Sequence, residues 1–169
     1  MMSAPILRAS CACGQVALEA QGAPMFAAVC YCDDCQAAGH EIEALAGAPP
    51  VLDADAGTPL VMFRKDRLAV VRGQDRLEPR KLKPGSATSR HVASCCNSAM
   101  YLGFDDARHW IDVFRGRIEG AAPPVQARIC TRSRPAGIPI ADDAPAYERY
   151  PLAMMVQLLR SRVAMLFGS

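Results

Sequence analysis

Short apolar runs separated by turn residues occupy most of the chain. An alternation of apolar and polar positions is typical of a half-buried strand, and a compact apolar run suits a buried one. Such patterns predict strands within residues 16–20, 25–29, 59–71, 87–104, 109–120 and 125–140. Many short strands with frequent turns indicate a mainly β domain.

Two segments carry more specific predictions. Leu60 and Met62 alternate before residues 64–66, and Leu68 and Val70 alternate after them, which predicts a hairpin. Residues 40–59 are rich in Ala, Gly, Pro and Asp. We expect a loop there, with at most one weak helical turn.

The end of the chain changes to a helical period. Its apolar residues recur at spacings of three and four, at Leu152, Met155, Val156, Leu159, Val163 and Leu166. This spacing predicts one amphipathic helix of about four turns. We therefore divide the chain into a β domain, residues 1–151, and a helix, residues 152–169. The helix either packs on the domain or forms a homodimer contact.

Composition and charge exclude some function classes. With 19 basic and 17 acidic residues, the net charge of +2 gives no general case for binding nucleic acid or a membrane surface. The basic stretch 78–90 has no interleaved aromatic residues, so we interpret it as a solvated hairpin edge. No apolar run approaches the roughly 20 residues of a membrane span, and the first residues lack a signal-peptide pattern. We expect a cytoplasmic location.

The chain has eight cysteines, seven of them in short clusters. In the cytosol such thiols bind metal or carry out thiol chemistry more often than they form disulfides. The clusters are Cys11 with Cys13, then Cys30, Cys32 and Cys35, then Cys95 with Cys96, while Cys130 stands alone. Gly14 and Asn97 follow two of the clusters and suit turns with left-handed backbone angles. Spacings of this kind are typical of zinc ligands.

The first and last pairs suit one closed structural zinc site. Cys11 and Cys13 with Cys95 and Cys96 supply four thiolates, and a zinc there would contribute directly to folding free energy. The alternative is that Cys95 is a buried apolar thiol. In that case His91 is the candidate fourth ligand, although it can equally be a hydrogen-bonded strand histidine.

The middle cluster stops one ligand short of a closed site. Cys30, Cys32 and Cys35 suit a catalytic zinc with three protein ligands and one open position. Three thiolates on a divalent ion make it a poor activator of water and a better holder of a thiolate, so the spacing favours a thiol substrate. We name these cysteines as the catalytic residues. Two alternatives stay open: a Cys32–Cys35 redox pair, or a structural site completed by His40 or Asp34.

Other polar and thiol residues carry weaker predictions. His40 can be a proton shuttle near the open position or a plain loop histidine. Arg132 and Arg134 can receive carboxylates or face solvent at a strand end. We expect Cys130 to be a buried strand thiol without function.

The order of these motifs resembles a known family. "CACG" at 11–14, "CYCDDCQAAG" at 30–39 and "HVASCCNSAMY" at 91–101 resemble the glutathione-dependent formaldehyde-activating enzymes and the centromere protein V-like proteins. The resemblance covers roughly residues 8–151. It implies a mainly β, zinc-ribbon-like fold with one structural zinc and a second zinc on the three-cysteine segment. The implied activity joins glutathione to formaldehyde and is classed as a carbon–sulfur lyase.

The last motif departs from the family pattern F-C-x-x-C-G. When Cys96 and Asn97 are aligned with the final C-G of this pattern, Ala93 occupies the position of its first cysteine. Cys95, two residues later, would then take the role of that cysteine. This departure affects the expected substrate more than the fold. Two functions therefore stay open: a zinc-dependent carbon–sulfur lyase acting on a thiol adduct, and a zinc-stabilised binding module without chemistry.

Overall fold

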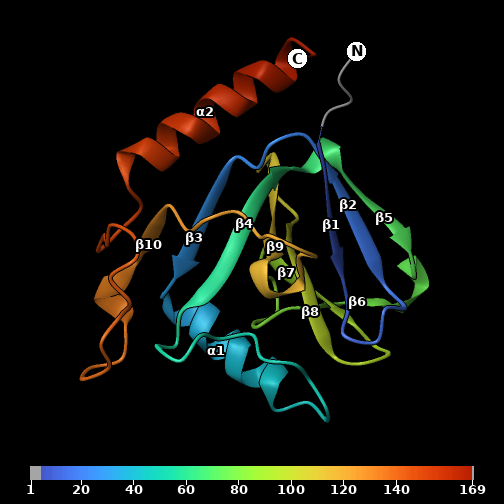
Figure 1. Ribbon diagram of the computed structural model, residues 1–169, viewed down its shortest axis with the longest axis horizontal. Coiled ribbons are helices and arrows are strands. Elements are labelled where there is room, and N and C mark those ends of the chain that lie inside the picture. Colours follow the sequence, from blue (N-terminus) through green and yellow to red (C-terminus); the bar gives the residue numbers. More distant parts are fainter. Residues whose placement is uncertain (1–4, 169) are drawn as a thin grey trace.

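The computed structural model describes residues 5–168 and is mainly β, as predicted (Figure 1). The larger sheet has seven strands in the order β10 (Ala127–Ile129), β3 (Phe26–Cys30), β4 (Thr58–Arg64), β9 (Trp110–Phe114), β8 (Ser98–Phe104), β7 (Thr88–Ala93) and β6 (Leu77–Arg80). The smaller sheet has the order β1 (Ile6–Ser10), β2 (Ala17–Gln21) and β5 (Leu68–Arg72). Neighbouring strands are antiparallel except β10 and β3, which run parallel.

The larger sheet buries apolar side chains on both faces. Val61 and Phe63 of β4 pack with Val16 and Leu18 beside the smaller sheet. The alternate residues, with Leu60 among them, belong to a second core that includes helix residues. This division follows from the two-residue period of a strand, which sends neighbouring side chains to opposite faces.

The hairpin predicted for residues 59–71 is wrong. β4 pairs with β3 and β9, whereas β5 pairs with β2 in the other sheet. A short 3₁₀ helix, Lys65–Arg67, separates the two strands, and the Lys65 amide donates to the His109 carbonyl at 3.0 Å. The alternation correctly indicated two strands, but it carried no information about their partners.

A helix that was not predicted, α1 (Asp33–Glu43), begins within the middle cysteines, and only its last turn enters the loop predicted for residues 40–59. Asp33 and Asp34 lie in its first turn, where negative charge favours a helix. Its buried side is formed by Cys35, Ala38, Gly39 and Ile42, a helical spacing of small residues. The rest of residues 40–59 is irregular, and the Glu43 carboxylate fixes it by accepting the amides of Val51 and Leu52 at 2.7 and 2.8 Å.

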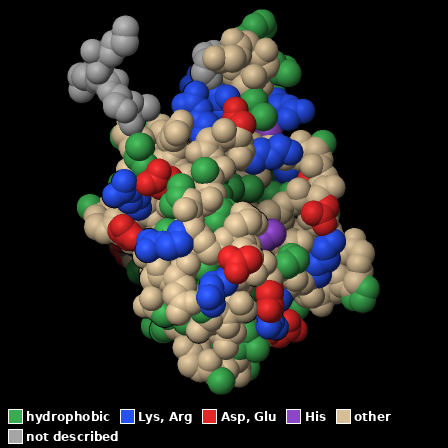
Figure 2. All heavy atoms as spheres, turned by 90° about the vertical axis from the view of Figure 1, so that its right-hand side faces the viewer, with side chains coloured by type: hydrophobic (Ala, Val, Ile, Leu, Met, Phe, Trp, Pro, Cys, Tyr) green, Lys and Arg blue, Asp and Glu red, His purple; other side chains and the backbone are tan. Residues whose placement is uncertain are grey.

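The terminal helix is confirmed as α2 (Leu152–Leu166), but the predicted apolar side is not the buried one. Met154 and Leu158 are buried in the core beside the larger sheet. The predicted face is exposed, with Leu152 and Leu159 at 79% and 65% exposure. Figure 2 shows hydrophobic side chains at the top of the molecule, where α2 ends. Among residues 5–168, no helix has the length and apolar character needed to cross a membrane.

A buried polar network fixes the strand that leads into the middle cysteines. The Tyr31 hydroxyl donates to Asp55 Oδ2 at 2.7 Å, and Arg128 Nη1 donates to the same oxygen at 2.9 Å. Arg128 Nη1 also contacts the Tyr31 hydroxyl, and Arg128 Nε donates to Asp143 at 2.7 Å. These bonds connect Tyr31, between Cys30 and Cys32, to β10 and to the loop before β4.

Removing the acid from this network should destabilise the fold. Asp55→Ala leaves the Arg128 guanidinium and the Tyr31 hydroxyl buried without their shared acceptor. We expect a loss of about 3 kcal/mol in the free energy of unfolding, measured by urea titration. Asp106→Ala, which breaks the exposed ion pair with Arg108, is the control and should change stability little. Equal losses in the two variants would contradict this role for the network.

Candidate metal and thiol centres

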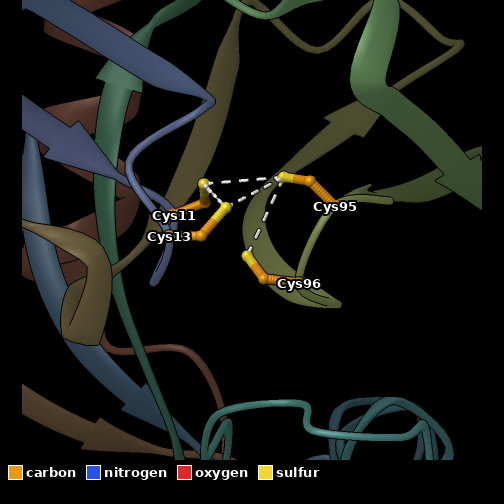
Figure 3. A group of neighbouring side chains, drawn as sticks. All are labelled: Cys11, Cys13, Cys95 and Cys96. Atoms are coloured by element: carbon orange, nitrogen blue, oxygen red, sulfur yellow. Dashed lines mark hydrogen bonds between the residues drawn. The ribbon is translucent and has the colours of Figure 1, made fainter.

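Four thiols meet where the two sheets approach each other (Figure 3). Cys11 and Cys13 lie on the turn between β1 and β2, in the smaller sheet. Cys95 and Cys96 lie on the turn between β7 and β8, in the larger one. Their sulfur atoms all lie within 4.8 Å of one another, so the structure brings together the four residues predicted as the structural site.

The sulfur separations suit a tetrahedral metal ion. Four thiolates at the usual zinc–sulfur bond length of about 2.3 Å would stand about 3.8 Å apart. The measured separations are 3.6 Å for Cys11–Cys13, 3.8 Å for Cys11–Cys95, 3.3 Å for Cys13–Cys95 and 3.9 Å for Cys95–Cys96. The soft donor set and this spacing both fit zinc.

Hydrogen bonds from groups outside the cluster reach Cys11 and Cys96, whereas burial, together with the neighbouring thiols, raises the pKa of Cys95 to about 12. The Val16 amide donates to Cys11 Sγ at 3.2 Å, and the Ser98 hydroxyl lies 3.1 Å from Cys96 Sγ. Burial raises the pKa of Cys96, but hydrogen bonds from Ser98 and the Cys13 amide outweigh it and lower that pKa to about 6. A thiolate is the form that binds a metal, so these contacts prepare the site for one.

The predicted turn conformations are confirmed. Gly14 and Asn97 have φ angles of +76° and +54°, which place both in the left-handed region. The Asn97 side chain also donates to the Ala46 carbonyl at 3.0 Å. The Cys95–Cys96 turn is therefore attached to the loop that follows α1.

His91 lies outside the four-thiol cluster. Its ring stacks on Tyr101 at a centroid distance of 4.2 Å, and burial lowers its pKa. Cys95, rather than His91, stands with the other three thiols. Of the two alternatives for the fourth position, the geometry favours Cys95.

The middle cysteines form a second, separate cluster of three thiols. Cys30 ends β3, Cys32 caps the start of α1, and Cys35 lies in its first turn. Their sulfur atoms lie within 4.8 Å of one another. Gln36 donates to the carbonyls of Tyr31 and, at 2.8 Å, Ser133, which fixes the strand-to-helix junction. The segment is thus a junction and not the loop that the spacing suggested.

Charge in this second cluster concentrates on Cys32. Hydrogen bonds from Cys30 and Cys35 lower the pKa of Cys32 to about 3, and the positive charge of Arg90 acts in the same direction. Cys30 has its pKa raised, chiefly by its hydrogen bond with Cys130. Cys130 is buried, as predicted, but it lies just after a strand and not within one. It follows β10 with a φ of +58°, contacts Cys30, and remains outside the group of three mutually close sulfurs.

The three-thiol cluster opens into a cavity of about 390 Å³. The cavity lies between the larger sheet and α2, because its lining includes residues of β4 and β8 together with Met154, Met155 and Leu158. Most of the lining is apolar, and the polar or charged groups in it are Asp34, Thr88, Arg90, Arg108, Asp112 and Tyr150. Such a volume is in the usual range for small-molecule sites.

Other residues predicted near the open position lie elsewhere. His40 is exposed on the last turn of α1 and does not line the cavity. Arg132 and Arg134 are exposed and are also absent from the lining. Asp34 does line it, and its carboxylate pairs with Lys83 at 3.3 Å. A metal bound by the three thiols therefore has no histidine ligand among the cavity-lining residues.

Sequence reasoning missed Arg90, Arg108 and Asp112 as members of this site. One signal was present: Asp112 is the single acidic residue in the otherwise apolar strand β9. A charged residue in the middle of an apolar strand is unusual unless it is paired or functional. Assigning it to this cavity still required the order of strands in the sheet.

Comparison with known proteins supports the resemblance inferred from the cysteine motifs. The model of the glutathione-dependent formaldehyde-activating enzyme family matches residues 6–49, a range that contains the first pair of cysteines and the three-thiol cluster. The resemblance to that family is therefore confirmed over this part of the chain. Among solved structures, one of a Rhodobacter sphaeroides protein is similar, with 18% identity and a TM-score of 0.49 over 69% of this chain and 91% of that one. A search of curated proteins found no match.

A metal in the four-thiol cluster should stabilise the whole fold. Cys11→Ser or Cys96→Ser removes one ligand from a site that connects the two sheets, so each should lower the melting temperature by about 10 °C or more. Removal of zinc from the wild type with a chelator should have a similar effect, measured by circular dichroism. Cys32→Ser, which leaves all four of these thiols in place, is the matched control. A melting curve that is unchanged after complete zinc removal would contradict a structural metal site.

Proposed function

We propose that this protein is a zinc-dependent enzyme that makes or breaks a carbon–sulfur bond in an adduct of a thiol and an aldehyde. The observation that carries this proposal is the three-thiol cluster in the wall of a cavity. Three ligands leave one position for an incoming group, and the cavity supplies room for it. Cys30, Cys32 and Cys35 would hold this zinc, and the four-thiol cluster would hold a structural one.

The chemistry suits a thiol substrate. When bound, zinc would keep a substrate thiol in its deprotonated, nucleophilic form at neutral pH. The protein holds the sulfur next to the cavity, so that the carbonyl carbon of a bound aldehyde lies within reach. Attack forms a carbon–sulfur bond and moves the carbonyl electron pair to oxygen, which takes up a proton. The reverse reaction releases the same thiolate.

The family match supports glutathione as the thiol and formaldehyde as the aldehyde, because both are in the family's description. The match covers only residues 6–49, so it bears on the cysteines and not on the cavity wall formed later in the chain. The class of reaction is therefore better supported than the identity of either substrate.

A second function is favoured by one observation. The outer face of α2 carries exposed apolar side chains, and Leu166 and Phe167 at its end are exposed to 72% and 81%. An apolar face of this kind is typical of a protein-binding surface. A zinc-stabilised binding module, or a homodimer formed through α2, would use it.

The division into residues 1–151 and 152–169 and the cytoplasmic location both remain predictions.

Replacing Cys32 should separate catalysis from folding. Cys32→Ser is expected to bind one zinc fewer per chain and to lose activity, because two thiolates remain in the second cluster. The fold should survive, since the four-thiol cluster is intact. The assay follows formation of S-hydroxymethylglutathione by exchange NMR, with the wild type and the variant at equal concentration.

Two results would count against the proposal. A wild-type rate no faster than the uncatalysed background would show that formaldehyde and glutathione are not the substrates. Equal acceleration by the wild type and Cys32→Ser would show that the three-thiol cluster is not the catalyst. Cys95→Ser, which alters only the other cluster, serves as the control for indirect effects of lost stability.

A further inference from the structure

One carboxyl group faces the cavity from the middle of the larger sheet. Asp112 lies on β9, between Met62 of β4 and Leu102 of β8, and all three line the cavity. The side chain of Met62 belongs to the core on the helix-covered face, as does that of Leu102. The sheet therefore projects a single acid among apolar neighbours, opposite α2.

This carboxyl group has an unsatisfied oxygen. Asp112 is 7% exposed, and its Oδ1 has no hydrogen-bond partner among the described residues. A buried polar atom without a partner costs free energy, and natural proteins keep few of them without a functional reason. Burial raises the pKa of Asp112 to about 7, and the positive charge of Arg108 only partly opposes this effect. Below that pH the group is a neutral acid that can donate a hydrogen bond.

The two arginines that line the cavity already interact with other protein groups. Arg90 donates to the Asp34 carbonyl at 3.1 Å, and Arg108 pairs with Asp106 at 2.6 Å while lying 3.9 Å from the centre of the Phe104 ring. The walls around Asp112 include Phe104, Trp110 and Met154. A charged ligand would find an apolar surface there. An uncharged ligand with one acceptor oxygen would accept a hydrogen bond from the protonated acid.

We propose that the cavity binds an uncharged, mainly apolar carbonyl compound, whose oxygen accepts a hydrogen bond from the Asp112 carboxyl group. The proposal extends the proposed function and rests on it for one point, that this ligand is the aldehyde partner of the thiol. Formaldehyde has a single carbon and would make little contact with the apolar lining around Asp112, which includes Phe104, Trp110 and Met154. The aldehyde that suits this cavity carries an apolar group, either an alkyl chain or an aromatic ring.

Asp112 can then supply the proton that the reaction requires. As the thiolate sulfur bonds to the carbonyl carbon, the carbonyl electron pair moves to oxygen, and the oxygen takes the proton of Asp112. The product is a neutral thiohemiacetal, and Asp112 becomes a carboxylate. The carboxylate regains a proton when the next thiol ionises, so no other reactant is consumed.

Binding can be tested without catalysis. The probe is acetophenone, which has a carbonyl acceptor, no donor and little reactivity toward thiols; ethylbenzene lacks the oxygen and is the matched ligand. Each is titrated by NMR into zinc-loaded wild type, Asp112→Asn and Asp112→Leu at pH 5.5 and pH 8.5. Asp105→Asn, which removes an exposed acid paired with Lys81, is the control variant.

Acetophenone is expected to bind tightly only when the Asp112 carboxyl group is protonated. Acetophenone should bind wild type and Asp105→Asn about tenfold more weakly at pH 8.5 than at pH 5.5, because the donated hydrogen bond is lost. Asp112→Asn keeps a donor that does not titrate and should show no such change. Asp112→Leu should bind weakly at both pH values, and ethylbenzene should be insensitive to pH throughout. The Asn variant should fold at least as stably as wild type above pH 7, because burying the charged acid no longer opposes folding.

The other titratable or charged groups that line the cavity are Asp34, Arg90, Arg108, Tyr150 and the three thiols. A pH effect that persists in Asp112→Asn would assign the titration to one of them and overturn the proposal. No saturable binding of acetophenone, or equal binding at both pH values, would overturn it as well. Binding as expected, together with no adduct formation by the wild type, would uphold the carbonyl site and reject the proposed enzyme function.

Discussion

The contact between two cysteine turns is the constraint on which this structure depends. Cys11 and Cys95 are 84 residues apart in sequence, and their sulfur atoms lie 3.8 Å apart. Each turn belongs to a different sheet, so the contact fixes how the small sheet lies against the large one. Without a metal, four close thiols gain little from their proximity, and charge on one raises the cost of charge on the next. A divalent cation bound by all four thiolates would offset this repulsion and connect the two sheets.

Once the small sheet covers one face of the larger sheet, the other face is left for helices and for the cavity. Strand alternation then decides which side chains reach each face. Val61 and Phe63 pack against the small sheet, while Met62 and Asp112 belong to the opposite side. The three-thiol cluster opens on this second side because β3 ends in Cys30, whose side chain faces the helices. The two cysteine clusters thus lie on opposite faces of one sheet, with Cys30 in one core and Cys11 in the other.

The cysteine clusters could be predicted from sequence because the signal is local. Spacing, residue type and the turn residues Gly14 and Asn97 identify each group of neighbouring thiols, whereas the pairing of the first group with the last was inferred from the four ligands of a closed zinc site. The partners of β4 could not be predicted, because alternation is the same for a hairpin and for two strands in different sheets. Helix α1 was missed since its buried side has only one large apolar residue, Ile42, beside Cys35, Ala38 and Gly39, which gives a weak apolar period.

The cavity could not be predicted from the sequence, because its lining residues are brought together by strand pairing and helix packing. Asp112 is recognisable as an odd residue in an apolar strand, yet its position near the thiols follows from the pairing of β9 with β4 and β8. The buried side of α2 also follows from packing. Met154 and Leu158 contact the core, while the regularly spaced apolar residues beside them face outward. Periodicity identified the helix, but not the side that packs.

X-ray absorption at the zinc edge tests the central claim most directly, that one cluster is closed and the other open. Zinc-loaded protein should contain two kinds of zinc in equal amounts, one with four sulfur ligands and one with three sulfurs and a lighter atom. Added glutathione should convert the second kind to four sulfurs and leave the first unchanged. A single kind of zinc with four sulfurs from the start, or one zinc per chain, would contradict an open thiol site.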